Sequence, residues 1–248
     1  MDGKEQTIKL VALDMDGTLL TKDHEVSVAN QTMIANAQAQ GITVMLCTGR
    51  WLAFCEPYAE QLGLDTYFVT VNGGEIWTAT KELVERHELA AEAIESMWHL
   101  GDKVGINMWM TSTTGNFMKS ERPDDFYAYQ WLKMGYSTED HKKLAAVNEQ
   151  LKTYEGLELT NSLPTNIEVN PHGVNKASAL VRVCKELGIT MEEVMAVGDS
   201  MNDIKMIEQA GIGVAMGNAQ EKVKVAADFI TAANDDDGVA KAIERLID

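Results

Sequence analysis

The fold follows from residues 8–18, which read Ile-Lys-Leu-Val-Ala-Leu-Asp-Met-Asp-Gly-Thr. Residues 8–13 predict an apolar strand that is buried on both faces, as in a parallel sheet covered by helices. Asp14 and Asp16 follow directly, and sites in open α/β sheets form where the strands reach their carboxyl ends. Two carboxylates that converge across a tight loop repel one another unless a cation lies between them. The segment therefore predicts a cation site at the edge of a sheet.

Strand and helix patterns alternate through the first third of the chain and again after residue 171. Ser27 suits a helix N-cap, and Gly41 suits the end of that helix. The other expected strands are residues 43–47, 67–71, 194–197, 213–215 and 229–230, and the later helices are residues 176–187, 203–210 and 239–247. Short βα repeats of this kind predict a doubly wound, Rossmann-like α/β fold with a parallel sheet and helices on both faces.

The middle of the chain, residues 82–171, follows an α+β pattern instead. We expect helices at residues 88–100 and 144–151, and a helical, aromatic-rich segment from Pro123 to Trp131. Two hairpins are expected, one from residues 106–110 and 116–120, the other from residues 157–160 and 166–169. We therefore predict an inserted α+β cap domain at residues 82–171, between two halves of one core at residues 1–81 and 172–248.

Composition and charge exclude several classes of protein. The net charge of −17 opposes binding to nucleic acid or to anionic membranes, so neither is an expected partner. No apolar run approaches the roughly 18 residues of a membrane span. Residues 1–9 do not resemble a signal peptide, and the three cysteines, Cys47, Cys55 and Cys184, lack C-x-x-C spacing. We expect a cytoplasmic protein with reduced thiols; the oligomeric state is not predicted.

A second acidic segment, Gly198-Asp199-Ser200-Met201-Asn202-Asp203, follows the strand at residues 194–197. Asp199 would end that strand and Asp203 would begin the next helix, where a carboxylate is also favoured by the helix dipole. Four carboxylates without a His or Cys cluster predict a Mg²⁺ site, provided that the two strands are neighbours. Mutual repulsion should raise the pKa values of all four: Asp14, Asp16, Asp199 and Asp203.

Two further segments offer groups that bind phosphate. Thr48-Gly49-Arg50 ends the strand at residues 43–47, and its hydroxyl and main-chain N–H groups could bind phosphate oxygens, although a simple strand-to-helix turn explains it equally well. Lys176 follows Asn175 at the start of a helix, where a lone lysine is usually solvated.

In this order the segments resemble the four motifs of the haloacid dehalogenase superfamily: Asp14-Met-Asp-Gly-Thr18, then Thr48, then Lys176, then Gly198-Asp199 with Asn202-Asp203. The chain is most similar to the Cof-type branch, the class IIB capped phosphatases. That similarity lies in Thr48-Gly-Arg50, Asn72-Gly73, Asn175-Lys176 and residues 213–218, and it spans nearly the whole core. The middle matches only in size and αβ character.

The resemblance implies a Mg²⁺-dependent phosphatase that acts through a phosphoaspartyl intermediate. Asp14 would be the nucleophile, and Asp16 would act first as general acid and then as general base. The Asp14 and Asp199 carboxylates and the Asp16 carbonyl would hold Mg²⁺, with Asp203 acting through water. The phosphoryl group would be held by Thr48, Gly49, Lys176 and Asn202.

Other readings of the same segments remain open. A phosphosugar mutase shares this core, and a receiver-type phosphoacceptor switch is also doubly wound with an acidic pocket, although receivers are about half this length and lack the second aspartate. The partner is expected to be a small phosphorylated metabolite, with sugar phosphates the commonest in the family. Candidate substrate contacts, each of which packing or turn formation also explains, are Arg50 and Asn72 in the core and Trp109, Met110, Asn116 and Asn166 in the cap.

Overall fold

The central strand of the larger part of the molecule is β1 (Leu10–Leu13), which pairs in parallel with a strand on each side. The computed structural model describes residues 7–247, so residues 1–6 of the polar start lie outside the described residues. The sheet has the order β13-β12-β11-β1-β2 and every pairing in it is parallel. Its other strands are β2 (Thr43–Leu46), β11 (Val194–Gly198), β12 (Ile212–Ala215) and β13 (Phe229–Ile230). The predicted doubly wound core is confirmed.

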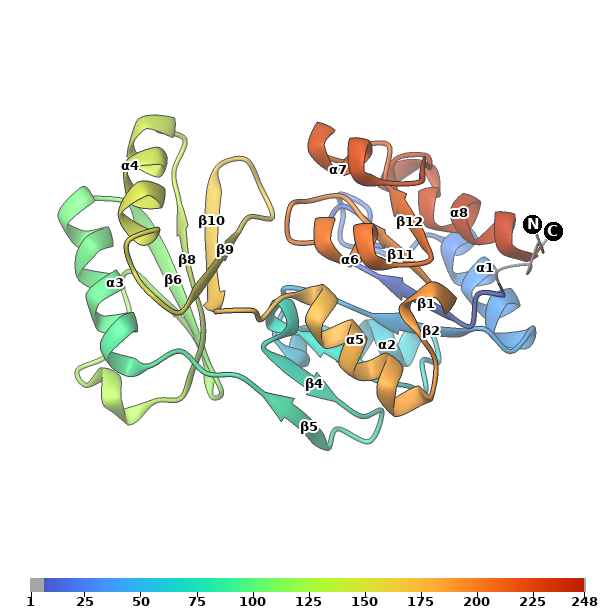
Figure 1. The fold of residues 1–248 in the computed structure, drawn as a ribbon, viewed down its shortest axis with the longest axis horizontal. Helices are drawn as coiled ribbons and strands as arrows, with labels where there is room; N and C mark the ends of the chain where they lie inside the picture. The colour runs from blue at the N-terminus through green and yellow to red at the C-terminus, as the bar shows by residue number, and fades with distance from the viewer. Residues whose placement is uncertain (1–6, 248) are drawn as a thin grey trace.

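Alternate residues of these strands enter two apolar layers. Val11 and Leu13 pack in the layer that includes α1 (Val28–Ala39) and α8 (Gly238–Ile247), while Leu10 and Ala12 pack in the layer that includes α5 (Lys176–Leu187). Figure 1 shows these helices on the two faces of the sheet. Three shorter helices complete the core: α2 (Glu56–Gln61), α6 (Ile204–Gln209) and α7 (Glu221–Ala226), the last of which the sequence pattern did not predict.

A three-stranded antiparallel sheet lies beside the core. It consists of β3 (Phe68–Thr70), β4 (Glu75–Trp77) and β5 (Leu83–Arg86), and an isolated bridge between Cys47 and Val69 joins it to the parallel sheet. The chain turns sharply at residues 72–74, with φ of 58° at Asn72 and 95° at Gly73.

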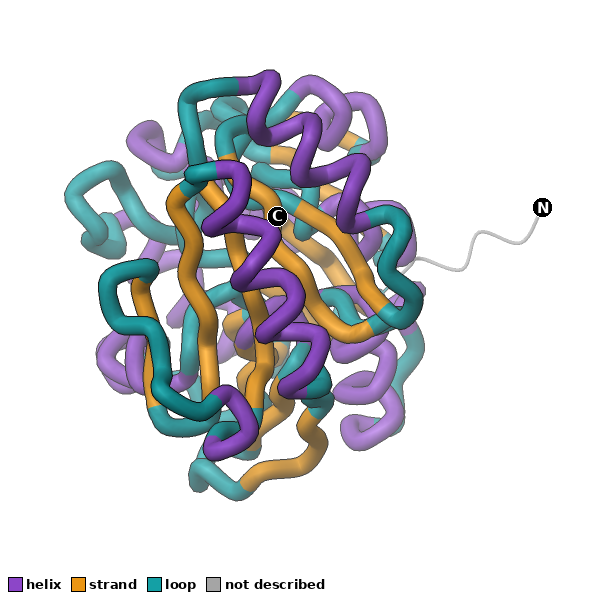
Figure 2. Tube along the Cα trace, turned by 90° about the vertical axis from the view of Figure 1, so that its left-hand side faces the viewer, coloured by secondary structure: helices purple, strands orange, loops and turns teal. Residues whose placement is uncertain are grey.

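The cap contains a five-stranded antiparallel sheet of order β7-β6-β8-β10-β9. One face is covered by α3 (Ala91–Val104) and α4 (His141–Leu151), and the other is turned toward the core (Figures 1 and 2). Both predicted hairpins are confirmed, as β6 with β7 and as β9 with β10. The strands are β6 (Asn107–Ser112), β7 (Gly115–Met118), β8 (Trp131–Ser137), β9 (Leu157–Thr160) and β10 (Asn166–Pro171).

The helical segment predicted between Pro123 and Trp131 is wrong. Only a short 3-10 turn forms there, at Phe126–Ala128, and β8 begins at Trp131. Phe126 and Trp131 are buried in the apolar core of the cap, so their spacing reflects a turn followed by a strand.

The two connections between core and cap lie side by side. His87, in the first, and His172, in the second, line one small cavity together with Gly73 and Glu85. Since β5 hydrogen-bonds to β4, residues 83–86 pack with the core, and we propose that the cap runs from about residue 88 to residue 171 rather than from residue 82.

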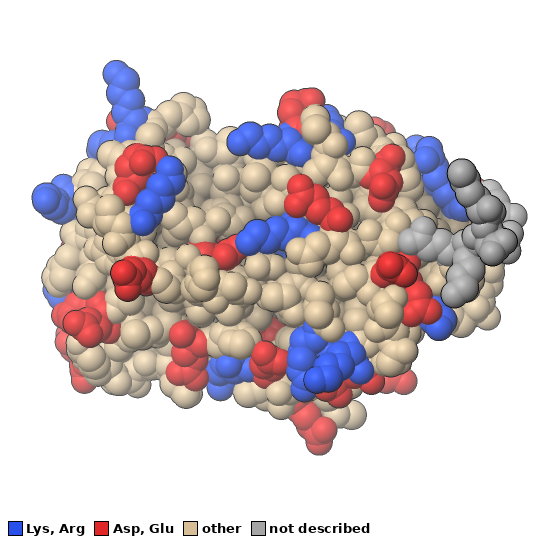
Figure 3. All heavy atoms as spheres, in the orientation of Figure 1, with Lys and Arg blue, Asp and Glu red and all other residues tan. Residues whose placement is uncertain are grey.

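The drawn surface carries charges of both signs, and the cysteines lie in the interior. Acidic and basic side chains are interspersed over the face drawn in Figure 3. Cys47, Cys55 and Cys184 are all buried and free. Within residues 7–247, no helix combines the length and the apolar character that crossing a bilayer requires.

Candidate active site

Two acidic loops meet because β1 and β11 are adjacent strands. Leu13 is paired with Val197, so Asp14 and Asp199 leave the sheet at the same edge, close to the start of α6. Carboxylate oxygens of Asp14, Asp199 and Asp203 all lie within 4.8 Å of one another. Gly17 permits this approach, because a Cβ at that position would stand 2.6 Å from Asp199 Oδ2.

Lys176 lies within this cluster and is completely buried. Its Nζ donates to Asp14 Oδ1 at 2.5 Å and to Asp203 Oδ1 at 2.6 Å. The side chain of Asn175 caps the first turn of α5 and so fixes the direction from which the lysine enters. Lys176 is therefore a buried cation held by two carboxylates, and not a solvated surface residue.

The second oxygen of Asp203 organises the loop that carries Asp199. Asp203 Oδ2 accepts hydrogen bonds from the main-chain N–H groups of Asp199 and Ser200, both at 3.0 Å. Both oxygens of Asp203 are thus engaged by the protein. Asp199 receives hydroxyl hydrogen bonds from Thr18 at 3.3 Å and from Ser200 at 2.9 Å.

The predicted elevation of carboxylate pKa values is confirmed for two of the four residues. Burial, together with the charges of Asp203 and Asp199, raises the pKa of Asp14 well above its ordinary value even though Lys176 opposes this. Burial and the charge of Asp203 raise the pKa of Asp199 to about 7. Burial would lower the pKa of Lys176, but Asp14 and Asp203 more than compensate, and its pKa is raised. The site thus concentrates negative charge that a single lysine does not neutralise.

Asp16 differs from the other three, and the prediction that its pKa is raised is wrong. Its carboxylate is half exposed and accepts two hydrogen bonds from Arg50, at 2.8 Å from Nε and 2.6 Å from Nη2. Burial alone would raise the pKa of Asp16, but the hydrogen bonds and charge of Arg50 outweigh it, and the pKa is lowered. The Asp16 side chain therefore stays anionic and lies outside the cluster of three carboxylates.

Asp199→Asn should stabilise the protein in chelator at pH 8. Asp199 ionises near pH 7 in the folded chain, against 3.8 ordinarily. The folded state therefore binds this proton more tightly, and the free energy of unfolding falls as pH rises between these two values. Thermal melts in EDTA should show a higher Tm for the variant at pH 8, by roughly 2–4 °C for each kcal/mol of repulsion removed, and little difference at pH 4. A variant that melts below wild type at pH 8 would exclude repulsion at this residue.

A cavity of about 370 Å³ opens over the carboxylates, between the core and the cap. Thr48, whose Oγ1 accepts from Arg50 N at 3.1 Å, is buried at the base of the loop that contributes Gly49 and Arg50 to the wall. From the core the cavity is lined by Asp14, Asp16, Gly49, Arg50, Asp199 and Asn202, and from the cap by Ser162, Leu163 and Glu168.

The sequence did not identify the cap residues that reach the core. Lys133 Nζ donates to the carbonyl oxygen of Gly49 at 2.9 Å and lies 3.6 Å from Glu168. Glu168 accepts from Asn72 Nδ2 at 2.5 Å and from Ser162 Oγ at 3.0 Å. Burial would raise the pKa of Glu168, but Lys133 and these hydrogen bonds lower it. The detectable signal was a charged residue between two apolar ones, Lys133 between Leu132 and Met134 and Glu168 between Ile167 and Val169.

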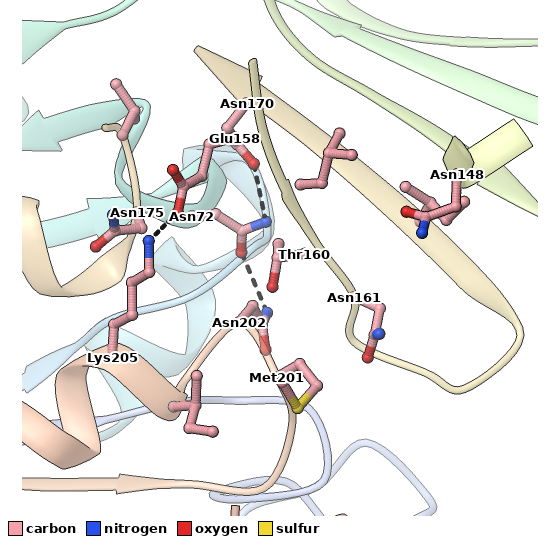
Figure 4. A pocket seen from close by; sticks show the side chains of 14 residues that line it. Asn72, Asn148, Glu158, Thr160, Asn161, Asn170, Asn175, Met201, Asn202 and Lys205 are labelled. Atoms are coloured by element: carbon pink, nitrogen blue, oxygen red, sulfur yellow. Dashed lines mark hydrogen bonds and ion pairs between the residues drawn. The ribbon is translucent and has the colours of Figure 1, made fainter. Parts of the chain in front are cut away.

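Asn72 and Asn202 connect this network to a second cavity. Asn202 Nδ2 donates to Asn72 Oδ1 at 3.2 Å, and the two side chains point toward one another in Figure 4. The second cavity measures about 250 Å³ and is bounded by β9 and α6, which an ion pair between Glu158 and Lys205 joins. Asn202 lines both cavities.

The four cap residues predicted to contact substrate do not line the catalytic cavity. Met110 packs in the apolar core of the cap. Asn116 is exposed on the edge strand β7. Asn166 accepts N–H groups of Ser162 and Leu163, both at 3.1 Å, and so shapes the loop that does line the cavity. Trp109 is partly buried, on the sheet face turned toward the core.

Fold and site together define a capped, doubly wound α/β protein with a buried Asp–Lys centre. A family model for haloacid dehalogenase-like hydrolases matches residues 11–131 and 116–243. The chain belongs to this family, and its fold is that of the Cof-type, class IIB capped branch.

The relatives of this chain include phosphatases. The chain is 48% identical to the 5-amino-6-(5-phospho-D-ribitylamino)uracil phosphatase YcsE of Bacillus subtilis, over 97% of this chain and 96% of that protein. A haloacid dehalogenase-like hydrolase from B. subtilis has a TM-score of 0.87 at 28% identity, over 96% of this chain and all of the other. The subclass IIB sugar phosphatase BT4131 has a TM-score of 0.82 at 24% identity, over 96% and 98%, which is a likeness of fold alone.

The chain is therefore a phosphatase of a small phosphorylated metabolite. The alternatives that the sequence left open, a phosphosugar mutase and a receiver-type switch, gain no support from these relatives.

Proposed function

We propose that this phosphatase acts by nucleophilic attack of Asp14 on the phosphorus of a phosphate monoester. The observation that carries the proposal is the position of Asp14, at the floor of the cavity, with one oxygen fixed by Lys176 and the other side chains of the cluster within 4.8 Å. Attack forms a phosphoaspartate and releases the alcohol, and water then hydrolyses the acyl phosphate. Splitting hydrolysis into two steps is a common route to a lower barrier.

Asp16 is the proposed proton donor to the leaving oxygen, and then the base that takes a proton from water. In this structure its carboxylate is held by Arg50 and its pKa is lowered. Donation of a proton therefore requires that Asp16 first separates from Arg50. Both residues line the cavity, so a substrate that enters can exchange this ion pair for contacts of its own.

The donor set fits Mg²⁺. Asp14 and Asp199 supply hard oxygen ligands without a neighbouring imidazole or thiolate donor in the cluster, and burial together with the neighbouring carboxylates raises the pKa of both, which a bound cation would oppose. We propose that these two carboxylates and the carbonyl of Asp16 hold the ion, with Asp203 acting through water. Bound Mg²⁺ would supply the positive charge that offsets the carboxylates and the phosphoryl oxygens.

We propose 5-amino-6-(5-phospho-D-ribitylamino)uracil as the substrate. The support is the 48% identity to the B. subtilis phosphatase of that compound, which extends over nearly all of both chains. The family resemblance favoured a free sugar phosphate. Only the likeness of fold to a sugar phosphatase supports that alternative.

Release of inorganic phosphate from this substrate should require Mg²⁺. With 5 mM EDTA as chelator we expect turnover to fall to background, and Ca²⁺ to restore it poorly because a larger ion with more ligands distorts the in-line geometry. The assay is phosphate release over a panel of phosphorylated metabolites, with and without chelator. Undiminished turnover in EDTA would contradict the metal site, and a clear preference for a free sugar phosphate would contradict the substrate.

A further inference from the structure

One row of residues crosses the cap sheet on the face that is turned toward the core. Trp109 of β6 is paired with Gly135 of β8, and Gly135 is paired with Glu168 of β10. Met108, which precedes Trp109, and Met134, which precedes Gly135, are buried in the apolar core on the face of the sheet that α3 and α4 cover. Because side chains alternate along a strand, Trp109 and Glu168 project from the opposite face of the sheet.

The indole of Trp109 lies over Gly135. A Cβ at residue 135 would stand 2.1, 2.2 and 2.5 Å from Cζ2, Cε2 and Cη2 of the indole, so only glycine lets the ring rest on the strand. One face of the ring is thus supported by main chain, while the residue as a whole remains only partly buried. The aromatic residues Phe117, Trp131 and Tyr136 pack on the helix side instead, so Trp109 is not part of that core.

The row leads from Trp109 to the catalytic cavity. Glu168 lines that cavity and is buried beside Lys133. Two strand spacings separate Trp109 from Glu168, which is about 10 Å. An extended chain of about eight bonds, which is the link from ring to phosphorus in a ribitylamino 5-phosphate, covers a distance of this order at roughly 1.2 Å per bond. A leaving group can therefore have its phosphate over Asp14 and a planar ring over Trp109.

We propose that Trp109 is a stacking platform for a planar heteroaromatic ring in the leaving group, and that the polyol chain joining ring and phosphate lies over Gly135 toward Glu168. This assignment rests on the proposed function, since it takes a ring on a polyol phosphate as substrate. It gives the cap a way to distinguish such a compound from a free polyol phosphate, which has the same chain and no ring. Stacking tolerates any flat π-face, so the ring's edge groups must be recognised elsewhere.

The test compares two substrates that share the D-ribityl 5-phosphate chain, with and without the ring and its linking amino group: 5-amino-6-(5-phospho-D-ribitylamino)uracil and D-ribitol 5-phosphate. For the ring-bearing substrate, Trp109→Ala should lower kcat/KM by about 10- to 100-fold, mainly through KM, since stacking of a base on an aromatic side chain has effects of this size. Trp109→Phe should retain most of the activity. For D-ribitol 5-phosphate all three proteins should agree within about twofold.

Two further variants separate stacking from a general disturbance. Gly135→Ala should displace the indole from the strand and reproduce the selective loss, whereas Trp77→Phe, in the sheet beside the core, should leave the ratio of the two substrates unchanged. Thermal melts report whether each variant folds. If wild type prefers the ring-bearing substrate and Trp109→Ala does not change that preference, the platform is wrong and the proposed function stands. If the wild-type enzyme prefers a phosphate without a ring, the proposed stacking on Trp109 is wrong. If it prefers another ring-bearing phosphate and Trp109→Ala removes that preference, the stacking role is supported and the proposed substrate is wrong.

Discussion

Asp14→Asn is expected to lower kcat by at least about 10,000-fold, the scale seen when a catalytic nucleophile is removed. An amide oxygen does not attack phosphorus as a carboxylate does, and it forms no stable acyl phosphate. Lys176 keeps Asp203 as a partner at 2.6 Å, so the fold should persist. The measurements are the steady-state rate of phosphate release and the amount of phosphoenzyme trapped by acid quench from a labelled substrate.

A matched control separates loss of the nucleophile from loss of charge. Asp65→Asn removes one negative charge at an exposed position and should leave both measurements unchanged. Turnover near the wild-type rate in Asp14→Asn would show that another group attacks phosphorus. Loss of turnover with full labelling of the protein would place the phosphoryl group on a different residue.

Lys176→Met should abolish activity and destabilise the protein by about 3–5 kcal/mol at pH 8, the usual cost of removing one partner from a buried ion pair. The substitution leaves Asp14 and Asp203 facing one another without a cation. Burial then favours the protonated form of Asp14. The pKa of Asp14 is already raised with Lys176 present, so removal of the Lys176 charge should raise the pKa of Asp14 further.

The pH dependence of the Lys176→Met stability defect shows whether carboxylate charge causes it. A carboxylate whose folded pKa is raised lowers the free energy of unfolding as pH rises toward that pKa, so the Lys176→Met defect should be larger at pH 8 than at pH 5. Urea denaturation in EDTA at both pH values measures it. Lys185→Met, on the exposed side of the same helix, is the control and should change stability little. A defect of equal size at both pH values would indicate lost packing rather than carboxylates without a counter-charge.

How much of the site could be predicted depended on whether its residues belong to local patterns. Asp14 and Asp199 could be placed because each follows a short apolar run, and parallel strands have their carboxyl ends at one edge. Neither segment indicates that β1 and β11 are adjacent strands. That expectation came from the resemblance to a family. The pairing of Asp16 with Arg50 was missed, because nothing in Thr48-Gly49-Arg50 indicates which anion the guanidinium meets.

The cap was less predictable for a physical reason. β8 carries Lys133 and Gly135 on one face and apolar residues on the other, so its pattern is interrupted by a charge and a glycine that the core-facing surface requires. The aromatic residues just before it then suggested a helix. The roles of Lys133 and Glu168 were missed because their contacts with Gly49 and Asn72 join the cap to the core, and no local pattern indicates such contacts.

The position of β1 between β2 and β11 also has a consequence for the order of folding. Residues 194–198 must be present before β1 has its second neighbour, so the parallel sheet closes across a long loop and its pairing is intrinsically slow. The cap lies within that loop and is built largely from hairpins and adjacent helices, which close quickly. During synthesis from the N-terminus, we expect the cap to become protease-resistant first, while the strand that carries Asp14 has an unpaired edge until the last third of the chain emerges from the ribosome.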